Sequence, residues 1–174
     1  MHAKRALAQA LLLMLAASSA QAGPIRCADD GDGGGACVWG RAEAFDADTI
    51  QLRGLRIQVL GVAAPGPRDL CATRDGKSEF ACARPARKRM AELIAKGVAC
   101  DILDVSSGTL FGRCRGAEGD VGRLLVAAGV ARAAKDGPYE AEQAAALAAG
   151  RGLWADSLSS PKEWESARRK AARD

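Results

Sequence analysis

Histidine is almost absent from this chain of 174 residues, and the single one, His2, lies near the N-terminus. Loss of that terminus would exclude Ser-His-Asp and Cys-His nucleophiles, histidine metal sites and histidine as a general base. Aromatic residues are also scarce, at 4% of the sequence. No aromatic ladder with interleaved basic residues marks a platform for stacking bases. Nucleic-acid binding is therefore not favoured by the composition.

The N-terminal residues have the layout of a secretory signal peptide. Lys4 and Arg5 precede an apolar run over residues 6–17, and the triplet Ala20-Gln21-Ala22 has small residues at its first and third positions. The run is shorter than the ~20 residues of a membrane span, so export with cleavage is favoured over a retained anchor. We predict a signal peptide over residues 1–22 and an exported protein, periplasmic or secreted, with no membrane span after cleavage.

Charge is nearly balanced once that segment is removed. The full chain carries 25 basic and 21 acidic residues, a formal net charge of +4, and the predicted mature chain retains +2. Bulk charge therefore demands no polyanionic partner. An unknown protein or cell-envelope partner is at least as plausible as a nucleic acid.

Six cysteines are present, all beyond the predicted signal peptide. An even count in an oxidising compartment indicates a disulfide framework, for which six cysteines allow 15 connectivities. Zinc is the competing use, but no C-x-x-C spacing occurs and the mature chain has no histidine to complete a site. Because the cysteines fall as neighbouring pairs along the chain, the predicted disulfides are Cys27–Cys37, Cys71–Cys82 and Cys100–Cys114.

Five short segments separated by turn residues predict strands. They are, in order, VWGRAEAF, TIQL, LRIQVLGV, VACDIL and LFGRCR, with the last two joined by a turn over residues 104–108. An amphipathic helix over residues 83–97 lies between the third and fourth strands, and further helices follow Asp120 and Tyr139. This order predicts a mixed β-barrel-plus-α fold: a five-stranded Greek-key barrel of the OB type with about three helices.

The first helix has an apolar and a basic face. Its apolar residues are Ala83, Ala86, Met90, Leu93 and Ile94. The basic residues Arg84, Arg87 and Lys88 lie opposite, and we interpret them as a solvated helix surface. We expect a polar loop over residues 67–82, and a solvated loop over residues 28–36 because this segment lacks the closing glutamate of a calcium loop.

The chain divides into four predicted segments. After the signal peptide, residues 23–37 form an N-terminal loop closed by a disulfide, residues 38–158 form the barrel domain, and residues 159–174 form a charged tail. The end of this tail is expected to be mobile.

The order of motifs resembles the staphylococcal-nuclease-like (thermonuclease) family. The resemblance covers roughly residues 38–164. It rests on FDADTIQLRGLRIQVLGVAAP, the helix ending MAELIAKG, VACDIL, LFGRC, GDVGRLLVAAGVARA, Tyr139, Glu142, GLW at residues 152–154, Pro161 and Trp164. It implies an OB-type barrel and calcium-dependent hydrolysis of DNA and RNA phosphodiesters. Such chemistry needs oxygen ligands for the ion, a carboxylate that acts on water, and cations beside the phosphate.

Three positions to which the resemblance assigns this chemistry hold residues that cannot perform it. The family's third strand runs R-I-R-L-L-G-I-D-A-P-E, in which the second arginine holds the phosphate, the aspartate binds calcium and the glutamate acts on water. In RIQVLGVAAPG these positions are Gln58, Ala63 and Gly66. General acid or base help is typically worth ~10² to 10⁴ in rate, and a phosphate-stabilising arginine ~10³ or more. Loss of all three predicts an inactive nuclease.

Other positions of the implied site are retained. Asp48 matches a calcium ligand and is followed by Thr49, Asp46 is also kept, and Arg113 matches the second phosphate-binding arginine. Both aspartates can also be ordinary turn residues, and Arg113 an ordinary arginine on a strand surface. This second interpretation is favoured, because the residues that would complete the site are replaced. Calcium prefers roughly 6 to 8 oxygens, so a site around Asp48 would bind it weakly at best.

Two hypotheses follow. The first is an exported pseudoenzyme, a binding or structural module that needs no cofactor, since OB-type barrels bind partners without a metal. The second is a weak or rebuilt calcium-dependent nuclease. Its residues would be Asp46, Asp48, Asp69, Arg56 and Arg113. Asp69 lies only three residues beyond Gly66, but prolines and Cys71 constrain its loop, so the sequence favours the first hypothesis.

Overall fold

The computed structural model describes residues 25, 27, 36–73, 75–155, 158–159 and 164. The predicted signal peptide lies outside these residues, as do most of the N-terminal loop and most of the C-terminal tail. The four predicted segment boundaries stay predictions. Within the described part of the chain, no helix is both long enough and apolar enough to cross a membrane.

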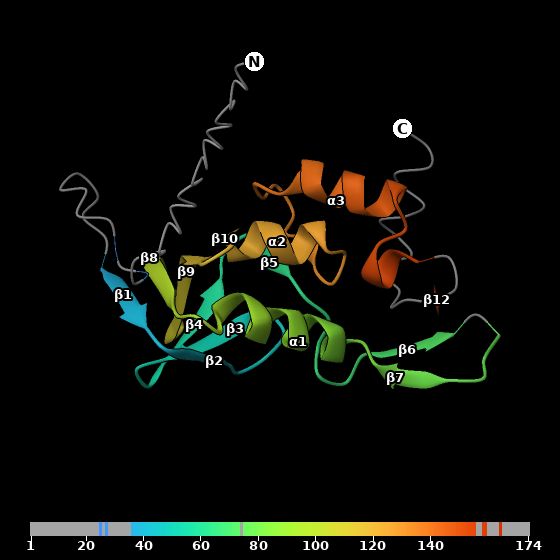
Figure 1. Cartoon of the computed structure of the whole chain (residues 1–174), viewed down its shortest axis with the longest axis horizontal. Coiled ribbons are helices and arrows are strands. Elements are labelled where there is room, and N and C mark those ends of the chain that lie inside the picture. The colour runs from blue at the N-terminus through green and yellow to red at the C-terminus, as the bar shows by residue number, and fades with distance from the viewer. Residues whose placement is uncertain are drawn as a thin grey trace, which may run out of the picture.

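A strongly curled sheet forms the centre of the fold (Figure 1). Its strand order is β1-β8-β9-β4-β3-β2, with β10 added on β9. The strands are β1 (Cys37–Gly40), β2 (Ala42–Ala44), β3 (Thr49–Leu52), β4 (Leu55–Val59), β8 (Val98–Ser106), β9 (Thr109–Gly116) and β10 (Gly119–Asp120). The β4–β9 pair is parallel and the other pairs are antiparallel. A barrel-like sheet combined with helices is thus confirmed.

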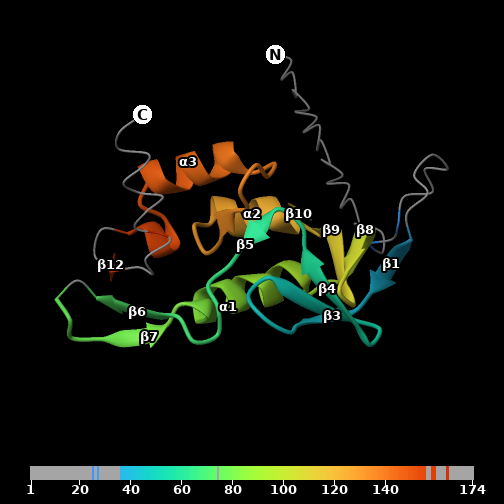
Figure 2. The ribbon, with the colours of Figure 1, turned by 180° about the vertical axis from the view of Figure 1, so that it is seen from behind.

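Three helices and two smaller sheets complete the described structure. The helices are α1 (Ala83–Ile94), α2 (Val121–Ala127) and α3 (Glu140–Ala148), followed by the short 3₁₀ helix η1 (Gly152–Trp154). The first small sheet pairs β5 (Val62–Ala63) with β11 (Arg132–Ala133). The second contains β12 (Leu158–Ser159), β6 (Leu70–Thr73) and β7 (Glu79–Ala81). Seen from behind, β5 leads from β4 toward α2 (Figure 2).

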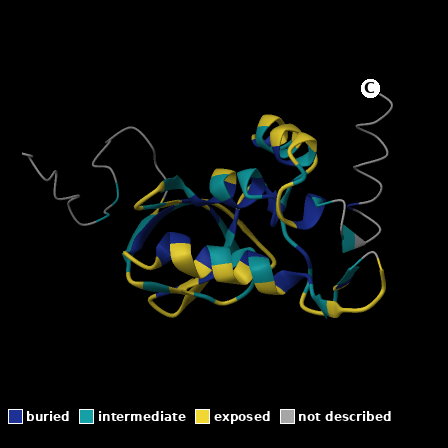
Figure 3. Ribbon diagram, turned by 45° about the vertical axis from the view of Figure 1, so that its right-hand side comes forward, coloured by how far each residue is buried: buried dark blue, intermediate teal, exposed yellow. Residues whose placement is uncertain are grey.

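The main core lies between the curled sheet and α1 and α2. Alternate residues of β3 and β4 are buried in it, among them Ile50, Leu52 and Ile57. The five apolar residues predicted for the first helix are all buried on α1, whose opposite side is exposed (Figure 3). As predicted, Asp120 caps α2: its Oδ1 accepts a hydrogen bond from the backbone N of Arg123 at 2.8 Å.

A second apolar cluster lies beyond the curled sheet and joins β6 to η1. Trp154 and Trp164 are both fully buried there, and their ring centroids are 4.4 Å apart. Cys71, Cys82 and Leu153 belong to the same cluster. This cluster holds Trp164, near the C-terminus, against the domain.

Three disulfides are present: Cys27–Cys37, Cys71–Cys82 and Cys100–Cys114. They are the pairs that the order of cysteines along the chain predicts. Cys100 and Cys114 lie directly opposite each other in the β8–β9 pair. Among the described residues no cysteine is free. This cysteine use fits an oxidising environment.

Several local expectations were wrong. The first predicted strand is divided into β1 and β2, and the third into β4 and β5. Residues 67–82 are not a plain polar loop, because β6 and β7 pair within it beside the Cys71–Cys82 disulfide. The turn expected at residues 104–108 is shorter, since β8 continues through a bulge between Ile102 and Asp104 and turns only at Ser107 and Gly108. Both turn residues have a positive φ, 50° and 77°, as a tight two-residue hairpin requires.

Candidate functional site

The β3–β4 pair brings together three residues of the predicted site: Asp48, Thr49 and Gln58. Thr49 lies opposite Gln58 in the register, and the backbone N of Val59 donates to Asp48 O at 2.9 Å. Gln58 Nε2 donates to Asp48 Oδ2 at 3.4 Å, and Thr49 Oγ1 donates to Asp48 Oδ1 at 3.0 Å. Each carboxylate oxygen of Asp48 therefore accepts a hydrogen bond from a neutral neighbour.

Burial raises the pKa of Asp48 above its ordinary value, and the negative charge of Asp46 raises it further. The hydrogen bonds from Thr49 and Gln58 lower the pKa but do not outweigh burial. An arginine at position 58, as the resemblance would place there, would favour the ionised carboxylate through its charge. Gln58 keeps a hydrogen bond to Asp48 and supplies no charge.

Replacement of Asp48 by asparagine is expected to stabilise the protein at neutral pH. The pKa of Asp48 has an ordinary value of 3.8 and is higher in the folded protein. When the pH lies between these two values, the folded state holds a proton that the unfolded state has lost. The free energy of unfolding therefore falls as the pH rises through this window. The gain in free energy of unfolding should thus be present above this window and absent below it. Thermal unfolding of both proteins across this pH range measures it.

Asp75 provides the matched control for this prediction. It is exposed on the β6–β7 turn, and its hydrogen bond from Thr73 lowers its pKa. Relative to the natural protein, Asp75→Asn should therefore lose, rather than gain, free energy of unfolding as the pH rises. A stability difference for Asp48→Asn that is the same at all pH values would contradict the assignment.

Position 63 faces a cation. Ala63 of β5 lies opposite Arg132 of β11, and residues paired in this way direct their side chains to the same face. Arg132 Nε is buried and has no hydrogen-bond partner among the described residues. A guanidinium beside this position opposes the binding of a second cation there. The place that the resemblance assigns to a calcium-binding aspartate is therefore unsuited to calcium.

Position 66 lies beside another carboxylate. The backbone N of Gly66 donates to Asp69 Oδ2 at 2.8 Å, and a Cβ atom at Gly66 would lie 3.6 Å from that oxygen. Asp69 thus occupies space next to the position to which the resemblance assigns the glutamate. Its carboxylate is used to hold the loop backbone.

The aspartates do not form a cluster that could hold a metal ion. Asp46 Oδ1 accepts from the backbone N of Ala47 at 2.8 Å, as a turn residue does. Within the described part of the chain, no three His, Cys, Asp or Glu side chains lie close enough together to share an ion. Asp46, Asp48 and Asp69 are therefore not gathered into one ligand set.

The two arginines of the predicted site contact other groups. The Arg56 guanidinium lies over the Phe45 ring, 3.9 Å from its centroid. Arg113 is exposed on β9, where it pairs in register with Asp101. Neither makes a hydrogen bond or ion pair with Asp48 in the described structure. The charge of Arg113 acts instead on Tyr139, whose pKa it lowers slightly against stronger opposing effects.

A buried polar pair near Arg113 was not predicted. Tyr139 OH donates to Asp120, at 2.9 Å from Oδ1 and 3.1 Å from Oδ2. Burial raises the pKa of Tyr139, and the hydrogen bond to Asp120 and its charge raise it further, so the hydroxyl stays protonated. Because Asp120 also caps α2, the pair fastens α2 to the start of α3. The sequence signal was weak: Tyr139 is the only tyrosine, but nothing local links it to Asp120.

The positions of the predicted site therefore make separate sets of contacts. Asp48, Thr49 and Gln58 form one hydrogen-bonded group, whereas Ala63 and Gly66 contact Arg132 and Asp69. No protein-family model matches this chain, and no curated protein matches it.

Proposed function

We propose that the chain is an exported staphylococcal-nuclease-like domain protein that has lost catalysis and acts as a binding or structural module. The motif order and the curled sheet support an OB-type, five-stranded Greek-key barrel as its framework. The parallel β4–β9 pair and the position of α1 before β8 agree with that framework. The three disulfides support export into an oxidising compartment.

The observation that carries the proposal is the contact between Gln58 and Asp48. Gln58, a neutral amide, occupies the position where phosphate binding would need a cation. It donates to Asp48, the retained aspartate that matches a calcium ligand. A neutral donor there stabilises the charge that develops on a phosphate less than a guanidinium would, and this donor is already directed at Asp48. The site has therefore lost its electrostatic function while keeping its hydrogen bonds.

The residues also do not fit calcium. A hard cation with six to eight oxygen ligands favours several carboxylates, but within the described part of the chain no three His, Cys, Asp or Glu side chains lie close enough together to share an ion. Arg132 lies opposite Ala63, where a second carboxylate would be required. We accordingly assign the ion no role in the function of this protein.

The alternative, a weak or rebuilt calcium-dependent nuclease, is favoured by one observation. The carboxylate of Asp69 lies beside Gly66 and could take the place of the missing glutamate. That role would require Asp69 to release the backbone N of Gly66.

Cleavage of labelled single-stranded DNA by the purified, disulfide-bonded protein in excess calcium separates the two functions. We expect no calcium-dependent product above a heat-denatured control. If the protein does cut, and if Asp48→Ala and Asp69→Ala abolish cutting while Asp75→Ala does not, the rebuilt nuclease is the correct function. Asp75 is suited as the control because it is an exposed aspartate on the β6–β7 turn.

A further inference from the structure

A basic groove runs between the edge strand β2 and the helix α1. It consists of two hollows that adjoin, because both have Ala42 and Glu43 in their walls. Six exposed cations line it: Arg41, Arg53, Arg84, Arg87, Lys88 and Lys96. Only two carboxylates, those of Glu43 and Asp46, line it as well. The groove is therefore strongly positive, although the bulk charge of the chain is nearly balanced.

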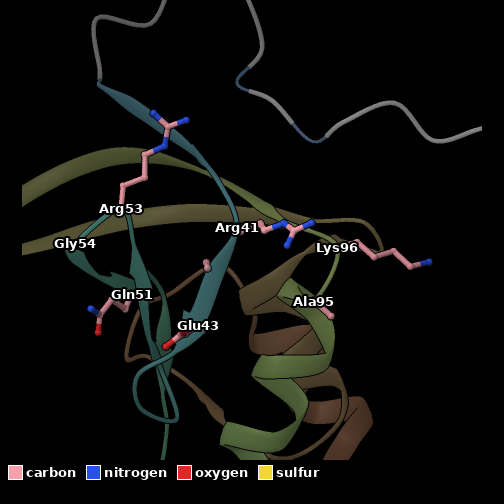
Figure 4. A pocket seen from close by; sticks show the side chains of 8 residues that line it. Arg41, Glu43, Gln51, Arg53, Gly54, Ala95 and Lys96 are labelled. Atoms are coloured by element: carbon pink, nitrogen blue, oxygen red, sulfur yellow. The ribbon is translucent and has the colours of Figure 1, made fainter.

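The cations at one end of the groove come from three separate places in the sequence (Figure 4). Arg41 precedes β2, Arg53 lies in the turn between β3 and β4, and Lys96 follows α1. Arg53 points away from the other two, whereas Arg41 and Lys96 extend in the same direction in this view, so the three cations do not converge on a single point (Figure 4). Such an arrangement suits an elongated ligand better than a small anion.

These cations are not neutralised within the described part of the chain. The ion pairs there use other basic residues: Lys77, Arg89, Arg115 and Arg123. Two of the groove cations are nevertheless held in place. Arg53 lies over the Trp39 ring at 5.2 Å, and Arg87 Nε donates to Ala44 O at 3.1 Å. The groove thus presents positive charge that can pair with an acidic ligand, and two of its cations are already held in position.

The strand beside the groove is the last strand of the sheet. β2 pairs with β3 at one edge and has no further strand at its other edge among the described residues. An edge strand offers backbone N–H and C=O groups to an added strand. The Ala44 carbonyl of β2 is directed toward α1, where it already accepts from Arg87 Nε.

The lining residues distinguish between classes of polyanion. No aromatic side chain lines either hollow, whereas proteins that bind single-stranded nucleic acids combine a basic groove with aromatic residues on which bases stack. The apolar part of the lining is mostly alanine, which leaves room for a backbone but provides no deep anchor pocket. An extended chain held by charge and by an edge strand fits these features.

We propose that the basic groove binds an acidic segment of a partner protein in extended conformation. This inference rests on the proposed function, for which it identifies the class of partner. Arg84 and Lys88 are four residues apart on α1, hence about 6 Å along its axis. Side chains on one face of an extended chain repeat every ~6.6 Å. Alternate carboxylates of the partner can therefore meet successive cations of the groove.

Binding of a fluorescein-labelled peptide of about eight residues, with glutamate at alternate positions, tests the proposal by fluorescence anisotropy. The full-length, disulfide-bonded chain should bind it, and the affinity should fall as salt is added. Arg84→Gln together with Lys88→Gln should weaken binding about threefold to tenfold. Glu43→Gln should strengthen binding about twofold, because it removes a carboxylate from the groove.

The matched control removes two charges elsewhere. Lys77 and Lys135 are exposed and lie outside the groove, so Lys77→Gln with Lys135→Gln should leave the affinity unchanged. Equal losses in both double variants, or no gain in Glu43→Gln, would overturn the groove assignment. Tighter binding of a single-stranded DNA of equal charge would overturn the choice of a polypeptide. Calcium-dependent cutting of that DNA would instead contradict the proposed function, whatever affinities the groove variants have for the peptide.

Discussion

Replacement of Trp154 by alanine is expected to lower the free energy of unfolding by about 3–5 kcal/mol. Trp154 is fully buried in the second apolar cluster, where its ring packs against that of Trp164. The substitution removes one of the two tryptophan side chains of this cluster and leaves a cavity between η1, β6 and Trp164. Total stabilities of natural domains are about 5–15 kcal/mol, so the loss should be a large part of the whole.

Chemical denaturation followed by far-ultraviolet circular dichroism measures this loss without relying on tryptophan fluorescence. Trp39→Ala is the matched control, because Trp39 on β1 is only half-buried and lies outside both apolar clusters. The control should cost clearly less than Trp154→Ala. A loss for Trp154→Ala no larger than that for Trp39→Ala would contradict the expected contribution of the second cluster to the stability of the domain.

Removal of the Cys100–Cys114 disulfide, by alanine at both positions, is expected to cost about 3 kcal/mol. The disulfide closes a loop with a sequence separation of 14 and joins β8 to β9 at the centre of the curled sheet. Both cysteines are buried in the main core, so alanine avoids placing a new polar group there. The unfolded chain of the variant has more freedom, which favours unfolding.

Denaturation with and without a reductant supplies the control for this prediction. In the oxidised state the natural protein should be more stable than the double variant. With a reductant the difference should largely disappear, because the natural protein then lacks the same covalent link. A double variant that equals the oxidised natural protein in stability would contradict a structural role for the disulfide.

Regular patterns in the sequence predicted much of the fold. The apolar face of α1 and the alternating burial of β3 and β4 follow directly from their periods of 3.6 and 2 residues. The β6–β7 hairpin was missed because its strands are short and it depends on the Cys71–Cys82 disulfide and on packing near Trp154. Strands of this kind are defined by tertiary contacts more than by local pattern.

The site was predicted only in part, for a similar reason. Asp48 and Gln58 meet because the β3–β4 register places Thr49, the neighbour of Asp48, opposite Gln58, which the short turn between the strands makes predictable. The Asp120–Tyr139 pair and the Arg132–Ala63 pair join residues far apart in sequence, and no local signal marks them. The sequence showed only the basic face of α1, which lines one half of the basic groove; the cations of the other half come from separate segments that the fold brings together.

The geometry also shows which substitutions could restore a nuclease site. A Cβ atom at position 66, as in Gly66→Glu, would make only ordinary contacts, the nearest 3.6 Å from Asp69 Oδ2. Ala63→Asp would face Arg132, which would pair with the new carboxylate and compete with calcium. Arg132→Gln is therefore combined with Gln58→Arg, Ala63→Asp and Gly66→Glu, so that the new aspartate is free to bind the ion.

Calcium-dependent cleavage of single-stranded DNA by the natural protein and by this restored variant tests most directly the claim that a nuclease fold has lost its catalysis. We predict that the natural protein shows no calcium-dependent cleavage. The folded, restored variant should cut at least ~10² times faster than the natural protein. Cleavage by the natural protein, or a folded restored variant that remains as silent as its parent, would contradict that claim.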